Sequence, residues 1–167
     1  DNTTHIIGKD ILRFHAAIWP AMLLAANLPL PQRILVHGFI TSGGQKMSKT
    51  LGNVIDPEEL LKIFSEVTDF SGDALRFILA HEVPSFEDGD LTMETIQASY
   101  TANLVNGIGN LTSRIMKMAV TNNVVLEVEN IKSIKQVYEF DINRALKVCM
   151  QDLHALDVSI ATNEPFK

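Results

Sequence analysis

The chain has 167 residues, a net charge of −6 and a single cysteine, Cys149. This length is typical of one domain, or of one domain with part of another. One cysteine excludes an internal disulfide framework and a cysteine-based metal cluster, and no apolar run approaches the roughly 20 residues of a membrane span. The first residues lack the pattern of a signal peptide. We therefore expect a cytoplasmic protein, in the cytosol or an organelle matrix, with no metal site and no membrane contact.

The first 40 residues follow a strand–helix–strand pattern. Residues 5–8 form a short apolar run that ends in glycine, and residues 34–40 form a second run of strand type. Residues 11–26 are helical in pattern and largely apolar, so most faces of this helix should be buried. Asp10 is the expected N-cap, and Pro20 predicts a kink or a restart of the helix.

A helix between two strands predicts a crossover between parallel strands. In parallel sheets the ligand crevice lies at the carboxyl ends of the strands. We therefore expect Gly8, Asp10, the first helical turn at 11–15, His37 and the loop that carries Lys46–Lys49 to surround one site.

The most informative stretch is 43–50, which reads Gly-Gly-Gln-Lys-Met-Ser-Lys-Thr. The glycine pair permits a turn that other residues cannot adopt easily. Lys46 and Lys49 can bind a polyphosphate as point charges, and the hydroxyls of Ser48 and Thr50 add hydrogen-bond donors. A solvated hairpin turn with surface lysines explains the same spacing, and the spacing alone leaves both interpretations open.

The rest of the chain is predicted to be helical. Asp56 and Pro57 are typical of a helix start. The composition changes from α/β to all-α near residue 90, so we predict one domain at 1–90 and a second at 91–167. Charge also differs along the chain: residues 1–56 carry five basic and three acidic side chains, so the negative charge lies in the remainder and non-specific nucleic-acid binding is not expected. The expected helices are 56–66, 74–82, 90–120, a weak one at 131–138 and 140–160, with a loop at 84–89 and a linker at 124–128.

Asn106, Asn110 and Arg114 recur every four residues on the long predicted helix and form a polar stripe beside its apolar seam. Gly107 and Gly109 lie between them, at a cost of about 1 kcal/mol each in a helix interior. Asn can read base edges and Arg can stack on a base or bind a phosphate. Alternatively, the amides connect this helix to a neighbouring helix of a bundle.

Several of these stretches resemble one family. Lys46–Thr50 resembles the KMSKS signature loop of class I aminoacyl-tRNA synthetases, with a threonine in place of the final serine. The similarity to methionyl-tRNA synthetases covers nearly the whole chain, in order and spacing. It implies the second half of a Rossmann-like nucleotide-binding fold with parallel strands, followed by an incomplete all-α anticodon-binding bundle. The segments that carry it are 8–11, 14–23, 36–39, 46–50 and 106–111 with Arg114.

The resemblance also implies site residues. Lys46 and Lys49 would be the catalytic groups that hold the phosphates, while Ile11 and His15 would line the methionine pocket. His15 could instead be a core histidine with its hydrogen bonds satisfied. The implied ATP-binding residues are Gly8, Asp10, His37, Ile40, Lys46, Ser48 and Lys49. The implied anticodon contacts are Asn106, Asn110, Arg114 and Phe166, where Phe166 replaces the tryptophan usual in the family.

The implied reaction is activation of methionine with its substrate ATP, which enters with Mg²⁺, and transfer of methionine to the 3′ end of tRNA(Met). The HIGH-type signature and the metal-binding module of the family would precede Asp1, so we expect a fragment of the synthetase that is inactive alone. Two alternatives remain: another class I synthetase, for leucine, isoleucine, valine or cysteine, and a non-catalytic tRNA-binding module derived from one.

Overall fold

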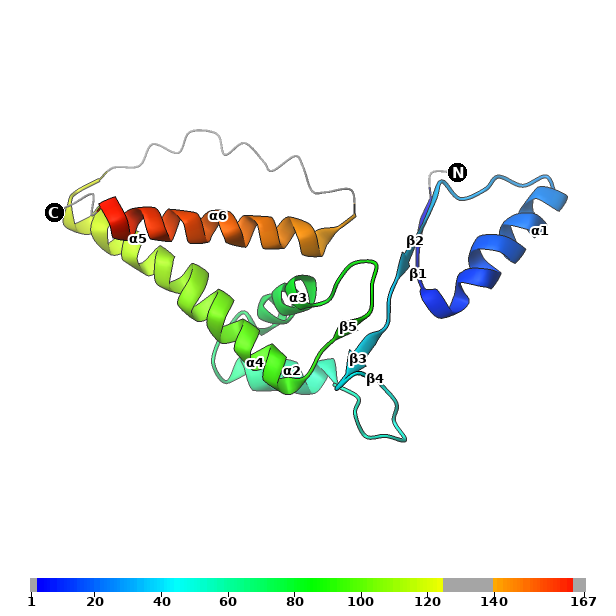
Figure 1. Cartoon of the computed structure of the whole chain (residues 1–167), viewed down its shortest axis with the longest axis horizontal. Helices are drawn as coiled ribbons and strands as arrows, with labels where there is room; N and C mark the ends of the chain where they lie inside the picture. Colours follow the sequence, from blue (N-terminus) through cyan, green and yellow to red (C-terminus); the bar gives the residue numbers. More distant parts are fainter. Residues whose placement is uncertain (1–2, 125–139, 164–167) are drawn as a thin grey trace.

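The computed structural model describes residues 3–124 and 140–163. Strand β1 (Thr4–Gly8) pairs in parallel with β2 (Arg33–His37), with Thr4 opposite Arg33 and Gly8 opposite His37. The helical segment between them confirms the predicted crossover, and it stands with the two strands as an arm beside the remaining helices (Figure 1).

The crossover helix is not uniform. A 3₁₀ turn, η1 (Lys9–Ile11), comes first, then a π-helical segment, η2 (Phe14–Ile18), and then α1 (Trp19–Ala25). The prediction that Asp10 caps the helix is wrong, because the turn begins before Asp10 and no side-chain cap is present. Pro20 lies in the first turn of α1, where the helix passes from π to α geometry without leaving helical backbone angles. The predicted kink or restart at Pro20 stays a prediction.

The expected burial of this helix is also wrong within the described residues. Phe14 is 64% exposed, Met22 is 63% exposed and Leu24 is 64% exposed. His5 of β1 contacts His15 and Trp19 on one side of the helix. The described remainder of the chain leaves Phe14, Met22 and Leu24 open to solvent.

The predicted strand at 34–40 is two strands. After β2 the chain bends at Gly38 and continues as β3 (Ile40–Ser42). Gly38 is buried, and a Cβ there would overlap the backbone of Glu87 and Asp88. This close approach therefore depends on a residue without a side chain.

A small second sheet carries the lysine-bearing stretch. β3 pairs antiparallel with β4 (Gln45–Lys46) and in parallel with β5 (Gly89–Asp90). β5 spans the end of the predicted loop and the predicted start of the long helix. The turn between β3 and β4 is Gly43-Gly44, with φ of +63° and +72°. These angles suit the two-residue hairpin turns that favour glycine. We call residues 43–52 the lysine loop.

The helical part begins with α2 (Pro57–Ser65) and α3 (Ser71–Glu82). The predicted cap at Asp56 is confirmed, since its carboxylate accepts a hydrogen bond from the Glu58 amide at 2.9 Å. These helices pack on the start of the next one around fully buried Ile78. Because this core has members on both sides of residue 90, the proposed domain boundary there stays a prediction. The other core residues are Leu60, Phe64, Ala74, Leu75, Leu91 and Ile96.

One long helical rod follows and contains a second π-helical segment. It runs through α4 (Met93–Ser99), η3 (Tyr100–Gly109) and α5 (Asn110–Thr121). The last helix, α6 (Ile142–Asn163), lies beside the rod (Figure 1). The predicted order of parallel α/β structure followed by helices is thus confirmed.

Three earlier predictions lie outside the described residues: most of the linker at 124–128, the weak helix at 131–138 and the role of Phe166. Across residues 3–124 and 140–163, none of the helices combines the length and apolarity that a membrane crossing requires.

Candidate functional site

Three residues predicted to bind ATP lie together at the carboxyl end of the β1–β2 pair. Gly8 is opposite His37 in the register. A Cβ on Gly8 would lie 2.8 Å from a carboxylate oxygen of Asp10 and 3.7 Å from Cε1 of His37, so the bare glycine lets both side chains approach the strand end. Nδ1 of His37 donates to the carbonyl of Gly38 at 2.8 Å, which leaves Nε2 of a neutral imidazole as an acceptor.

The lysine loop begins at the same edge. The ammonium of Lys46 lies 4.5 Å from the ring centroid of Phe39, and the ammonium of Lys9, which follows β1 directly, lies at the same distance from that ring. Ile40 begins β3 and is 39% exposed. The structure therefore brings the first lysine of the loop to the edge where Gly8 emerges.

The far part of the loop is held by its own polar groups. The amide of Ser48 donates to the Asn53 side chain at 2.8 Å, and the Ser48 hydroxyl accepts from the Thr50 amide at 3.3 Å. Gly52 has a φ of +66°, which closes the loop. Lys49 is exposed. A polyphosphate could reach its ammonium without any rearrangement of the loop backbone.

The two residues predicted to bind methionine lie on the crossover helix. Ile11 is 43% exposed, and His15 is half-buried. Nε2 of His15 lies 3.0 Å from Nδ1 of His5 on β1, and the ring of Trp19 lies 5.0 Å from both imidazoles. The contact with His5 gives one ring nitrogen of His15 a hydrogen-bond partner, as expected for a core histidine. The ring is only half-buried, however, so it also remains accessible to a ligand.

The polar stripe on the rod is divided between two kinds of helix. Asn106 lies in the π-helical η3, whereas Asn110 and Arg114 lie in α5. Both asparagines are exposed, so neither amide ties the rod to a neighbouring helix through a buried contact. Arg114 is half-buried and forms an ion pair with Asp157 of α6. The connection to the neighbouring helix α6 thus comes from Arg114 and not from the amides, for which the alternative was stated.

The two glycines of the stripe fit the π-helical geometry. A Cβ on Gly109 would lie 2.7 Å from the carbonyl oxygen of Leu104, and one on Gly107 would lie 3.1 Å from that of Ala102. Both carbonyls belong to the residue five positions earlier, which a π-turn brings close. The glycines thus permit the π-helix. This role was not apparent from the sequence, where the two glycines only indicated a loss of α-helix stability.

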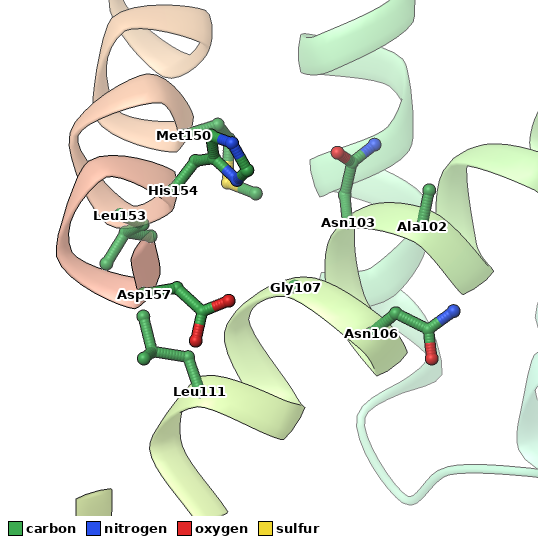
Figure 2. Close-up of a pocket in the computed structure, with 9 residues that line it drawn as sticks. All are labelled: Ala102, Asn103, Asn106, Gly107, Leu111, Met150, Leu153, His154 and Asp157. Atoms are coloured by element: carbon green, nitrogen blue, oxygen red, sulfur yellow. The ribbon is translucent and has the colours of Figure 1, made fainter. Parts of the chain in front are cut away.

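A pocket of about 290 Å³ lies between η3 and α6. In Figure 2, His154 and Asp157 extend from α6 toward η3, whereas the amide of Asn106 points away from α6. Its lining combines polar side chains with apolar ones such as Leu111 and Met150. The other residues that line it are Ala102, Asn103, Gly107 and Leu153.

Comparison with known proteins decides the family. The family model described as tRNA synthetases class I (M) matches residues 1–116. The methionine–tRNA ligase of Rhizobium meliloti is 48% identical over 118 residues, which cover 71% of this chain and 22% of the relative. The chain belongs to the methionyl-tRNA synthetase family.

Other members of this family extend the match. The methionine–tRNA ligase of Nostoc sp. is 37% identical over 181 residues, covering 97% of this chain and 33% of the relative. A solved structure of Mycobacterium tuberculosis methionyl-tRNA synthetase in complex with methionyl-adenylate has a TM-score of 0.81 and 30% identity, covering 98% of this chain and 34% of that one. The chain thus spans about a fifth to a third of these methionyl-tRNA synthetases.

Sequence reasoning missed four residues that the structure places around the site: His5, Trp19, Asp88 and Asp90. Trp19 follows His15 by four positions and so shares a helix face with it, a signal that could have been read. The carboxylates lie in a stretch without periodicity, and nothing local in the sequence pointed to them. Among residues 3–124 and 140–163 there is no cluster of three His, Cys, Asp or Glu side chains that could hold a metal ion.

Proposed function

We propose that this chain is the part of a methionine–tRNA ligase that completes the ATP site and begins the anticodon-binding bundle. Residues up to about 90 would form the second half of a Rossmann-like domain, and residues 91–167 would begin the bundle. The observation that carries the proposal is that Gly8 and His37 lie opposite each other where β1 and β2 end, and that Lys46 lies over the ring of Phe39, two residues after His37, in a chain of this family.

In the proposed reaction a carboxylate oxygen of methionine attacks the α-phosphorus of ATP, which enters with Mg²⁺. The bond to the bridging oxygen breaks, and pyrophosphate leaves with that electron pair. A hydroxyl of the terminal tRNA ribose then attacks the acyl carbon, and AMP leaves. Because activation needs little proton transfer from the protein, positioning and charge stabilisation provide most of the catalysis.

Each residue has a proposed role in the first step. Lys46 and Lys49 meet the negative charge that develops on pyrophosphate, and Ser48 holds the loop in shape. His37 accepts a hydrogen bond from the adenine through Nε2, with the backbone at Ile40 beside it. Gly8 and Asp10 contact the ribose or the amino-acid end of the adenylate.

Recognition of methionine is assigned to Ile11 and His15. An apolar pocket discriminates side chains that differ by a methylene only by about 10–200-fold. The half-buried His15 imidazole adds a polar group beside the thioether. The exposed apolar face of the crossover helix, which includes Phe14 and Met22, supports packing against the remainder of a larger catalytic domain.

Recognition of tRNA is assigned to the polar stripe. The exposed amides of Asn106 and Asn110 would read base edges of the CAU anticodon, and Arg114 would bind beside them after it leaves Asp157. Phe166 is proposed to stack on an anticodon base.

The test is ATP–pyrophosphate exchange by a complete ligase that contains this segment. Exchange that depends on methionine supports the proposal. Exchange with leucine, isoleucine, valine or cysteine in its place would assign another class I synthetase, and tRNA binding without exchange would indicate a non-catalytic module. The isolated chain should give no exchange, because the proposed site lacks its other half.

A further inference from the structure

Two carboxylates, Asp90 within β5 and Asp88 just before it, hold the root of the lysine loop, although neither belongs to the loop. The first is Asp90. One of its oxygens accepts hydrogen bonds from the Gly44 amide at 2.8 Å and from the Thr41 hydroxyl at 2.7 Å. Asp90 therefore fixes the turn that joins β3 to β4, two residues before Lys46.

The second carboxylate is Asp88. Both of its oxygens lie 2.6 Å from the Lys9 ammonium, and one also accepts the Phe39 amide at 2.8 Å. Lys9 and Lys46 each lie 4.5 Å from the Phe39 ring centroid. Asp88 thus fixes both Lys9 and the backbone of Phe39, and the ring of Phe39 is where Lys46 rests.

The position of β5 is itself fixed by close packing. Gly38 leaves no room for a Cβ against the backbone of Glu87 and Asp88, so the segment before β5 lies directly on the bend after β2. The hydrogen bonds also lower the pKa of both carboxyls, chiefly the Lys9 contact for Asp88 and the Gly44 amide for Asp90. Both groups are consequently anions at neutral pH.

We propose that Asp88 and Asp90 are positioning residues for the lysine loop: Asp90 sets the direction of the hairpin, and Asp88, through Lys9 and Phe39, sets the resting place of Lys46. This inference rests on the proposed function, because the lysines that Asp88 and Asp90 would position are the ones proposed to contact the phosphates.

The arrangement suits a loop whose lysine side chains must be available to a polyphosphate. A cation over an aromatic ring is held less strongly than a cation paired with an anion, so ATP can take Lys46 from Phe39. The Lys9 ammonium balances the charge of Asp88, which limits the repulsion of an incoming phosphate. One oxygen of the Asp90 carboxylate already accepts two hydrogen bonds, from the Thr41 hydroxyl and the Gly44 amide.

The experiment is ATP–pyrophosphate exchange by a complete ligase that contains this segment, with ATP and methionine varied separately. Asp90→Ala and Asp88→Ala should each lower kcat/KM for ATP about tenfold, the effect of losing roughly one charge-assisted hydrogen bond. The KM for methionine should not change. Asp90→Asn should restore most of the activity, because its amide oxygen can accept the same two hydrogen bonds.

Asp73→Asn is the matched control, since Asp73 is an exposed aspartate paired with Arg76 on α3, away from the loop. It should leave both parameters unchanged. If Asp90→Ala does not fold, Thr41→Val is measured instead. It removes the Thr41 hydroxyl, which donates to the same carboxylate, and should also lower kcat/KM for ATP. Unchanged kcat/KM for ATP, or a rise in the KM for methionine as large as the loss in kcat/KM for ATP, overturns the inference.

Lys49→Ala in the same ligase separates this inference from the proposed function. If Lys49→Ala abolishes exchange but the aspartate variants do not affect it, only the positioning role fails. If Lys49→Ala has no effect either, the assignment of the lysine loop to the phosphates fails as well.

Discussion

The lysine loop and the polar stripe on the rod are stabilised in opposite ways. The loop depends on partners far away in the sequence: Asp88 contacts Lys9, 79 residues earlier. At the stripe, the π-turn depends on its own backbone, where Gly107 and Gly109 permit it through contacts with residues five positions earlier, although Arg114 also pairs with Asp157 of α6. A change near the stripe should therefore act locally on the helix, whereas the loop should respond to changes in distant elements.

The difference also separates two steps of the proposed reaction. Loop residues would act on ATP, before any tRNA is needed, and stripe residues would act only on tRNA. Variants of the two regions should therefore affect different assays, and the predictions below test that separation in order of expected effect.

The largest effect is expected for Lys49→Ala in a complete ligase. Removing an exposed ammonium that meets charge on the leaving pyrophosphate should cost about 2.7–4 kcal/mol of transition-state stabilisation, comparable to one oxyanion donor. The measurement is the rate of pyrophosphate exchange at saturating methionine, with the KM for methionine unchanged. Lys62→Ala, an exposed lysine on α2, is the control. Equal loss in rate and in methionine affinity would contradict the role.

The next effect is on stability. Gly109→Ala places a methyl group 2.7 Å from the Leu104 carbonyl, so the π-turn must distort. We expect a loss of about 1–3 kcal/mol, as for overpacking, measured by urea unfolding. Gly72→Ala on α3 is the matched control: its Cβ would meet only the end of the flexible Arg76 side chain at 3.3 Å. That helix should gain up to about 1 kcal/mol. A neutral Gly109→Ala would refute the explanation of the glycine.

Arg114→Ala should act on tRNA alone. Loss of one phosphate or base contact should raise the KM for tRNA about tenfold, roughly 1.4 kcal/mol, and leave pyrophosphate exchange unchanged. Asp157→Asn should lower the KM for tRNA, because it releases Arg114 from its ion pair. Both variants are compared in aminoacylation and exchange assays of one complete ligase. A loss of exchange in Arg114→Ala would break the separation between the two regions.

The sequence predicted much of this arrangement, for identifiable reasons. The crossover and the cap at Asp56 follow from local periodicity and residue chemistry, and both are present. The bend at Gly38 could not be predicted, because it depends on the backbone of residues 87–88, which are distant in sequence. The π-helical segments were missed because an apolar repeat of three or four residues does not distinguish an i→i+5 turn from an α-turn.

The same limit applies to the two sites. Lys46 and Lys49 were found because they form a short motif, and the stripe was found because helical spacing is regular. Asp88 and Asp90 were not found, because each acts on a partner more than 40 residues away. Residues that hold a site from another element leave no pattern in one sequence.

The smallest effect expected is the pH dependence of the contacts at the loop root. The pKa of Asp88 is lowered chiefly by the hydrogen bond from Lys9, and that of Asp90 by the Gly44 amide. An unfolded aspartate has a pKa of about 3.9. Because the folded pKa values are lower, the stabilisation is fully present above the unfolded value and is lost as the pH falls through the folded values.

The double variant Asp88→Asn, Asp90→Asn isolates this contribution. The difference in urea midpoint between the native chain and the variant should be constant above about pH 5, where unfolded aspartates are ionised, and should shrink on acidification below about pH 4. Because both carboxylates are exposed, high salt should also reduce the part that comes from the Asp88–Lys9 pair. A difference that grows as the pH falls would mean that these carboxylates are held as acids, and the loop root would then need another explanation.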